Sequence, residues 1–147
     1  MTLENLADRF WSKAMEMQPT IATVRGVHDY DHLLPSLDDE WVADMSSSFR
    51  GVIAETEALE VDSMAIQERI TQSLLLHQCR SRLGEVETPF RRASVDPFLG
   101  PHTRLLSDTR QNTVTDIEQA NALLERYSRV PAYLSAALGT HIHCVDN

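Results

Sequence analysis

The chain has 147 residues, a length that suits one domain rather than two. Hydrophobic residues make up 42% of it, which is enough to bury a core and excludes a disordered chain. The net charge of −9 would repel the phosphates of nucleic acids and the surfaces of anionic membranes, so neither is an expected partner.

The compartment is predicted from what the sequence lacks. The first ten residues, MTLENLADRF, have neither the basic segment nor the long apolar segment of a signal peptide. No apolar run approaches the roughly 20 residues of a membrane span. Cys79 and Cys144 lie far apart without a CxxC spacing, which favours two free thiols in a reducing compartment. These features together predict a cytoplasmic protein.

Apolar spacing predicts a first helix over about residues 3–17, with Thr2 as its N-cap. Pro19 excludes the helical conformation for the residue before it, so the helix is expected to end there. A short turn, TIATVR, should follow and stop at Gly26, a natural residue for a helix end. The buried stripe of the first helix is expected to comprise Leu3, Ala7, Phe10, Ala14 and Met17.

Two further helices are predicted in the middle of the chain. The segment GVHDYDHLLPSL reads as a polar loop, after which Ser36 or Asp38 can cap the second helix. The third helix is expected from about Ser63 to Leu83, closed by Gly84. The buried face of the second helix should carry Trp41, Met45, Phe49, Val52 and Leu59. The buried face of the third should carry Ile66, Ile70, Leu74 and His77.

Residues 85–113 hold three prolines and Gly100, which predicts a long irregular connection. The last helix is expected to open with Thr115 and Glu118, which have the spacing of a capping box, and to break or kink at Pro131. Its buried stripe should comprise Ile117, Ala120, Leu124 and Tyr127.

The predicted fold class is therefore all-α, with about four main helices in antiparallel packing and a long irregular loop before the last helix. Residues 1–139 are predicted to form a single helical domain. Residues 140–147 lack a helical pattern and are predicted to be an irregular tail.

One loop carries the residue types of a metal site, namely His28, Asp29, Asp31 and His32. Metal ligands must converge from several directions, but Asp29 and Asp31 alternate with Tyr30, so these side chains cannot all converge. No distant His/Glu pair completes a ligand set. The sequence instead favours a structural corner in which Asp31 accepts backbone N–H bonds, His28 bridges helix ends and Tyr30 buries its ring.

The other histidines give no clear site. His77 is expected to be a core histidine, because side chains two residues apart on a helix point about 200° apart and His77 cannot face Cys79. His102 has no visible partner, and the pair in HIHC near the end is expected to be incidental. No H-E-x-x-H, G-x-S-x-G, Walker or dinucleotide-binding motif is present, so no catalytic residue and no metal ligand is predicted.

Two groups of motifs follow one another along the chain. The first group is an aromatic-rich helix followed by P-x-x-A-T-x-x-G and G-x-H-x-Y-D-x-x-L-P-x-L. Its positions in this chain are Phe10, Trp11, Pro19, Ala22, Thr23, Gly26, His28, Tyr30, Asp31, Leu34, Pro35 and Leu37. A G-P-H loop, T-x-x-D and R-x-x-x-x-P-x-Y-L come later, on Gly100, Pro101, His102, Thr113, Asp116, Arg126, Pro131, Tyr133 and Leu134. In order and spacing, over about residues 8 to 139, these motifs resemble the bacterial family known as domain of unknown function 885.

The resemblance implies a mostly helical protein several times this length, whose far C-terminal part carries a zinc-peptidase-like H-E-x-x-x-H helix. This chain contains no such motif, so zinc is expected only in full-length relatives. The chain is therefore expected to be an N-terminal helical module that is inactive alone. From Gly139 it departs from the family's long helix, which looks like an early stop, a frameshift or one half of a split gene.

Within that interpretation, four polar residues would line or brace a substrate cleft in a full-length relative, with support favoured over chemistry. They are His28, Tyr30, Asp31 and His102. Two alternatives stay open. The chain is a free-standing helical interaction module that self-associates or binds a separately encoded C-terminal part, or it is the product of a degraded reading frame.

Overall fold

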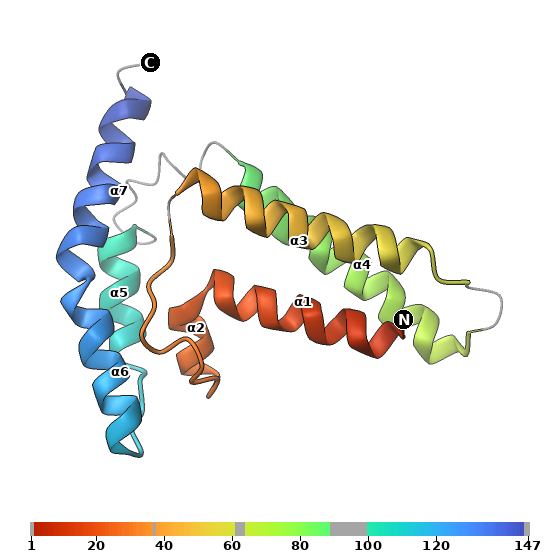
Figure 1. The fold of residues 1–147 in the computed structure, drawn as a ribbon, viewed down its shortest axis with the longest axis horizontal. Helices are drawn as coiled ribbons and strands as arrows, with labels where there is room; N and C mark the ends of the chain where they lie inside the picture. Colours follow the sequence, from red (N-terminus) through yellow and green to blue (C-terminus); the bar gives the residue numbers. More distant parts are fainter. Residues whose placement is uncertain (1, 37, 61–63, 89–99, 146–147) are drawn as a thin grey trace. The chain divides into compact units, whose positions relative to one another are not determined.

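The computed structural model describes residues 2–36, 38–60, 64–88 and 100–145. All regular structure in these residues is helical, which confirms the predicted all-α class. The helices are labelled in Figure 1: α1 (Leu3–Met17), α2 (Pro19–Val24), α3 (Asp39–Glu57), α4 (Ile66–Glu87), α5 (Pro101–Thr109), α6 (Ile117–Ser128) and α7 (Val130–Val145). None of the helices in these ranges is both long and apolar enough to cross a lipid bilayer.

The contacts divide the chain into two compact units. Unit 1 comprises Met1–Ala14 and Asp38–Thr88, and unit 2 comprises Met15–Leu37 and Pro89–Asn147. The single domain expected over residues 1–139 stays a prediction. The described helices are more numerous than the four main ones expected, because α2 and α5 are additional and the last predicted helix is divided into α6 and α7.

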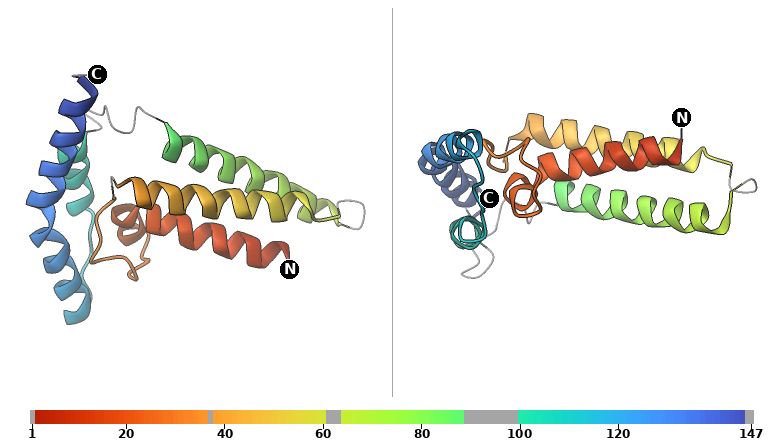
Figure 2. Two further views of the ribbon diagram at one scale, coloured as in Figure 1. Left: turned by 45° about the horizontal axis from the view of Figure 1, so that its top comes forward. Right: turned by 90° about the horizontal axis from the view of Figure 1, so that it is seen from below.

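Unit 1 contains α3, α4 and the part of α1 up to Ala14, and α3 runs antiparallel to the other two helices (Figures 1 and 2). Its core cluster joins all three helices through Leu6 of α1, Val52 of α3, and Leu75 and Cys79 of α4. The rings of Phe10 and Phe49 are tilted against each other with their centroids 6.1 Å apart, a favourable aromatic arrangement. Each helix thus contributes apolar side chains to one shared core.

The start of α1 and the turn after α2 follow the sequence predictions. The backbone N–H of Asn5 donates to Thr2 Oγ1 at 3.3 Å, which confirms Thr2 as the N-cap. Gly26 has a φ of +78°, a conformation that glycine adopts without the steric cost of a Cβ atom. The prediction of a turn at TIATVR is wrong, because Pro19–Val24 forms the short helix α2. Pro19 stands at its first position, where the missing N–H costs nothing.

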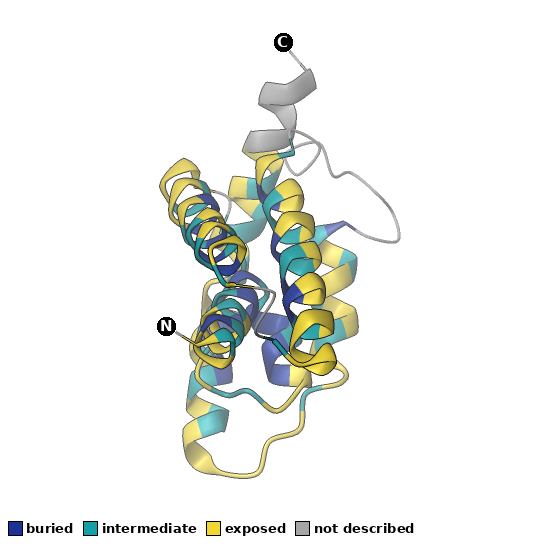
Figure 3. Ribbon diagram, turned by 90° about the vertical axis from the view of Figure 1, so that its right-hand side faces the viewer, coloured by how far each residue is buried: buried dark blue, intermediate teal, exposed yellow. Residues whose placement is uncertain are grey.

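The α3 helix buries the face that its sequence predicts, whereas α4 does not. Met45, Phe49 and Val52 of α3 are all buried. In α4, the expected face is wrong: Ile66, Ile70 and Leu74 are 74%, 55% and 56% exposed, and His77 is exposed rather than a core residue. The buried residues of α4 are Gln72, Leu75, Cys79 and Val86. Figure 3 shows buried and exposed residues alternating along the same helices.

A polar residue explains the error in α4. Gln72 points inward because its Nε2 donates to the carbonyl of Thr56 on α3 at 2.9 Å. That bond satisfies a buried amide, so the inward face tolerates a glutamine that an apolar pattern does not anticipate. Gly84 lies inside α4, which continues to Glu87, so the predicted helix end at Gly84 is also wrong.

Cys79 is fully buried in unit 1, and this burial raises the pKa of its thiol to about 11. Because the thiolate is the reactive form, we expect iodoacetamide at about pH 8 to leave Cys79 unmodified in the folded chain and to alkylate it readily in urea. Peptide mass spectrometry measures both. Rapid labelling of Cys79 in the folded chain would contradict its position in the core.

The same pKa shift gives a pH dependence of stability. The unfolded thiol loses its proton near its ordinary pKa of 9.0 and the folded one only at about 11, so the free energy of unfolding should fall as the pH rises between these values. The expected loss is roughly 3 kcal/mol, from two pKa units at about 1.36 kcal/mol each. In Cys79→Ala this part of the slope should vanish, as measured by urea unfolding across that pH range.

Unit 2 contains α2, α5, α6 and α7, with α2 and α7 both contacting α5 and α6 contacting α7. The α5 helix occupies part of the connection predicted to be irregular, and residues 89–99 of that connection lie outside the described residues. Asp116 rather than Thr115 caps α6, because its carboxylate accepts from the Gln119 N–H at 2.8 Å. The tail predicted to be irregular from Thr140 belongs to α7 as far as Val145.

The α6 helix buries a different face from the one predicted. Ile117 and Leu124 are 72% and 66% exposed, while Leu123 and Arg126 are buried. The break near Pro131 is confirmed, since α6 ends at Ser128 and α7 begins at Val130. A buried arginine on α6 is the feature from which the candidate site is built.

Candidate functional site

A cluster of polar residues joins α2, the turn that follows it and α6 within unit 2. We call it the Arg126 cluster, and it comprises Pro19, Thr23, His28, Tyr30, Asp31 and Arg126. Asp31 and Arg126 are each only 1% exposed. Charged residues are rarely so deeply buried unless they are paired, so the cluster calls for an account of each polar atom.

Arg126 holds three backbone and side-chain groups through one nitrogen. Its Nη2 donates to the carbonyl of Pro19 at 3.1 Å, to Thr23 Oγ1 at 2.8 Å and to the carbonyl of Tyr30 at 2.8 Å. Nη2 carries two hydrogens, so the three acceptors share them. The arginine therefore ties α6 to both ends of α2 and to the turn beyond it.

Burial destabilises the charged form of Arg126, and the nearby Asp31 stabilises it. Burial lowers the pKa of the guanidinium, and the nearby carboxylate of Asp31 acts in the opposite direction. The distance from Arg126 Nη2 to Asp31 Oδ1 is 4.0 Å, too long for a hydrogen bond but close enough for a strong Coulomb attraction in a buried setting. Since arginine stays protonated in proteins, the two residues form a buried ion pair.

Thr23 forms a hydrogen bond through its hydroxyl with each of these two charged residues. Its hydroxyl accepts from Arg126 and donates to Asp31 Oδ1 at 2.6 Å. The carbonyl of Pro19 lies 3.1 Å from the same hydroxyl, but a threonine has one hydrogen and the nearer carboxylate is the stronger acceptor. The threonine thus fits the cluster only when its hydroxyl points from the arginine toward the aspartate.

His28 completes the coordination of the carboxylate. Its Nδ1 lies 2.8 Å from Asp31 Oδ2, so each oxygen of Asp31 has its own donor. The His28 side chain is 33% exposed, whereas that of Asp31 is 1% exposed. The histidine therefore stands at the solvent side of the cluster.

One donor of the cluster is left unsatisfied. Arg126 Nε is buried and has no hydrogen-bond partner among the described residues. A buried donor without a partner lowers stability, so this atom offsets part of the stabilisation that the other hydrogen bonds of the Arg126 cluster provide.

The structure brings together three of the four residues singled out in the sequence. His28 and Asp31 belong to the Arg126 cluster through their side chains and Tyr30 through its backbone carbonyl, while His102 is exposed on α5. Asp31 takes its bonds from side chains rather than from backbone N–H groups of the turn. The described part of the chain contains no group of three or more His, Cys, Asp or Glu side chains placed to hold a metal ion.

Sequence reasoning missed Thr23 and Arg126 as site residues, although both stand in the motifs quoted above. A signal was present: Arg126 lies three residues after Leu123, on the same face of α6, and both are buried. An arginine in a helix is ordinarily solvent-exposed, so a pattern of apolar residues alone does not reveal that Arg126 is buried.

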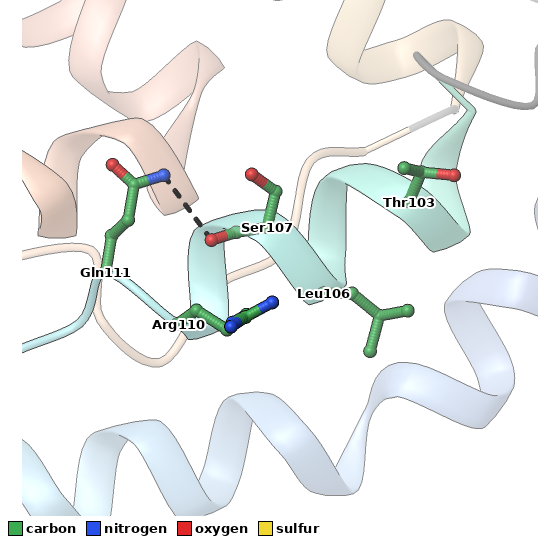
Figure 4. A pocket seen from close by; sticks show the side chains of 5 residues that line it. All are labelled: Thr103, Leu106, Ser107, Arg110 and Gln111. Carbon is green, nitrogen blue, oxygen red and sulfur yellow. Dashed lines mark hydrogen bonds between the residues drawn. The ribbon is translucent and has the colours of Figure 1, made fainter.

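A shallow hollow lies along α5, lined by Thr103, Leu106, Ser107, Arg110 and Gln111 (Figure 4), with a volume of about 430 Å³. Gln111 Nε2 donates across it to the carbonyl of Ser107 at 3.4 Å. All five residues come from α5 and the turn after it, and Leu106 is 69% exposed. Ligand sites bury most of their ligand, and a surface from one helix does not provide such enclosure.

Comparison of the chain with models of protein families, with curated proteins and with solved structures finds no match.

Proposed function

We propose that this chain is a helical support module of a larger metallopeptidase-like protein of the domain of unknown function 885 type, and that it does not catalyse hydrolysis by itself. Its polar loop braces the fold rather than forming a zinc centre. In this proposal the bracing residues are His28, Tyr30 and Asp31, and α6 supplies the counter-charge through Arg126.

The Arg126 cluster is the observation that supports the proposal. Its six residues all occupy motif positions that the resemblance rests on, and they come from two segments separated by about a hundred residues: the contact between Arg126 and Pro19 spans 107 positions. A motif whose polar atoms bind one another has a structural role without any substrate. The antiparallel packing of about four main helices, expected from the sequence, is part of the same proposal.

The proposal is tested with the purified chain alone. After expression in zinc-supplemented medium, inductively coupled plasma mass spectrometry should find far less than one zinc per chain, and casein or unstructured peptides should not be hydrolysed above a blank. Stoichiometric zinc together with hydrolysis that a chelator abolishes would contradict the proposal. The variant His28→Gln separates the two outcomes, because loss of zinc in that variant would place the ion at the loop.

A free-standing interaction module is the second candidate, and the outer face of α4 favours it. Ile66, Ile70 and Leu74 form an exposed apolar stripe, and the buried residues Leu75 and Cys79 point to the other side of the helix. Size-exclusion chromatography with light scattering on the chain and on Ile70→Gln tests self-association. A monomer at high micromolar concentration in both would count against this candidate.

A further inference from the structure

Asp31 fixes the hydrogen position on His28. A carboxylate can only accept a hydrogen bond, so the 2.8 Å contact between His28 Nδ1 and Asp31 Oδ2 requires a hydrogen on Nδ1. In the neutral imidazole the other nitrogen, Nε2, then carries the lone pair. The histidine is therefore held with its accepting nitrogen on the side of the ring away from Asp31.

The carboxylate that orients His28 is itself held in place. Thr23 donates to the other oxygen of Asp31 at 2.6 Å, and Arg126 donates to Thr23 at 2.8 Å. Arg126 and Thr23 therefore donate in sequence toward Asp31, and His28 donates to the same carboxylate from the other side. Rotation of Asp31 away from His28 would break the bond from Thr23.

Burial changes sharply along this chain of bonds. Asp31 is 1% exposed and the His28 side chain is 33% exposed, so solvent reaches the histidine but not the carboxylate that orients it. An imidazole oriented by a buried carboxylate, with its second nitrogen accessible, is the arrangement that proteins use to accept a proton.

We propose that His28 is a positioned proton acceptor whose Nε2 takes a hydrogen bond or a proton from the hydroxyl of a ligand or of water, with Asp31 as its positioning residue. On transfer, the O–H bond breaks, its electron pair stays on oxygen, and the new N–H bond forms at Nε2. This role of His28 goes beyond support of the fold and depends on residues of unit 2 alone.

Nitrogen-15 NMR of the intact chain tests the hydrogen position without any substitution. At a pH where histidines are neutral, two-bond proton–nitrogen correlations should show His28 protonated at Nδ1. The exposed His77 and His102 should show the Nε2–H form that free histidine prefers. The variant His28→Gln assigns the signal. A His28 that carries its hydrogen on Nε2 would overturn the inference.

Accessibility of Nε2 is tested with diethyl pyrocarbonate, an electrophile that Nε2 attacks at a carbonyl carbon, releasing ethyl carbonate. Exposure alone predicts that His28 reacts more slowly than His77 and His102. The proposed orientation predicts that it reacts several-fold faster than either, and faster than His32 of the same turn, as followed by peptide mass spectrometry. Equal or slower modification of His28 would overturn the inference. Zinc content enters neither measurement, so the proposed function is tested separately.

Discussion

Replacement of Arg126 by methionine is expected to lower the free energy of unfolding by about 3–5 kcal/mol, because it leaves the carboxylate of Asp31 buried without its cation. The carbonyls of Pro19 and Tyr30 lose their donor in the same step. Methionine keeps most of the side-chain volume, so the loss reports the charge and the hydrogen bonds rather than a cavity. Urea unfolding followed by circular dichroism measures it.

Arg129→Met is the matched control. Arg129 lies directly after α6, is 47% exposed in its side chain and pairs with Glu125 at the surface. Exposed pairs of this kind contribute little, so the control should change stability by no more than about 0.5 kcal/mol. A cost of Arg126→Met close to that of the control would mean that the arginine is not buried as described.

The double variant Arg126→Met with Asp31→Leu completes a thermodynamic cycle. Removing both charges abolishes the uncompensated carboxylate, so the double variant should be more stable than the sum of the single changes predicts. Thr23→Val should cost about 1–3 kcal/mol, because an isosteric side chain without a hydroxyl leaves the buried Asp31 Oδ1 without its hydrogen-bond donor.

Leu75→Ala is expected to lower the free energy of unfolding by about 2–5 kcal/mol, whereas Leu74→Ala should change it by no more than about 0.5 kcal/mol. The two leucines are neighbours in α4, but Leu75 is 5% exposed and lies in the core cluster, while Leu74 is 56% exposed. Truncation at Leu75 leaves a cavity against α1 and α3, and truncation at Leu74 leaves none.

The same two substitutions also test which face of α4 is buried. The apolar pattern places Leu74 inward together with Ile66 and Ile70, and the structure places Leu75 inward together with Cys79. Because the two substitutions delete the same atoms from the same kind of residue, helix propensity cancels. A larger loss at Leu74 than at Leu75 would show that the pattern, and not the structure, gives the buried face.

The helical class and the face of α3 could be predicted from the sequence because Met45, Phe49 and Val52 recur at helical spacing and are all apolar. The face of α4 could not. Its inward residues include Gln72, whose burial depends on the carbonyl of Thr56 sixteen residues earlier, and periodicity carries no information on such a partner. An apolar stripe predicts a buried face only when no hydrogen-bonded polar residue competes for it.

Only part of the candidate site could be predicted from the sequence, for a similar reason. The turn that holds His28, Tyr30 and Asp31 is visible as a dense polar segment, so its residues could be singled out. Their partner Arg126 lies 95 positions after Asp31 in the chain, and charge alone predicts an exposed side chain. Long-range pairing of buried charges is decided by the tertiary structure, which a single sequence does not display.

The order of the units along the chain has a consequence for folding. The two segments of unit 2 are separated by Asp38–Thr88, so α2 must wait for α6 to be made before Arg126 can reach it. Closing so long a loop costs entropy, and contacts between distant residues slow folding. The antiparallel α3 and α4 follow one another in the chain and pack together, so they can form early and shorten the loop that remains to be closed. During synthesis, the Asp31 carboxylate therefore stays exposed to water until Arg126 has left the ribosome.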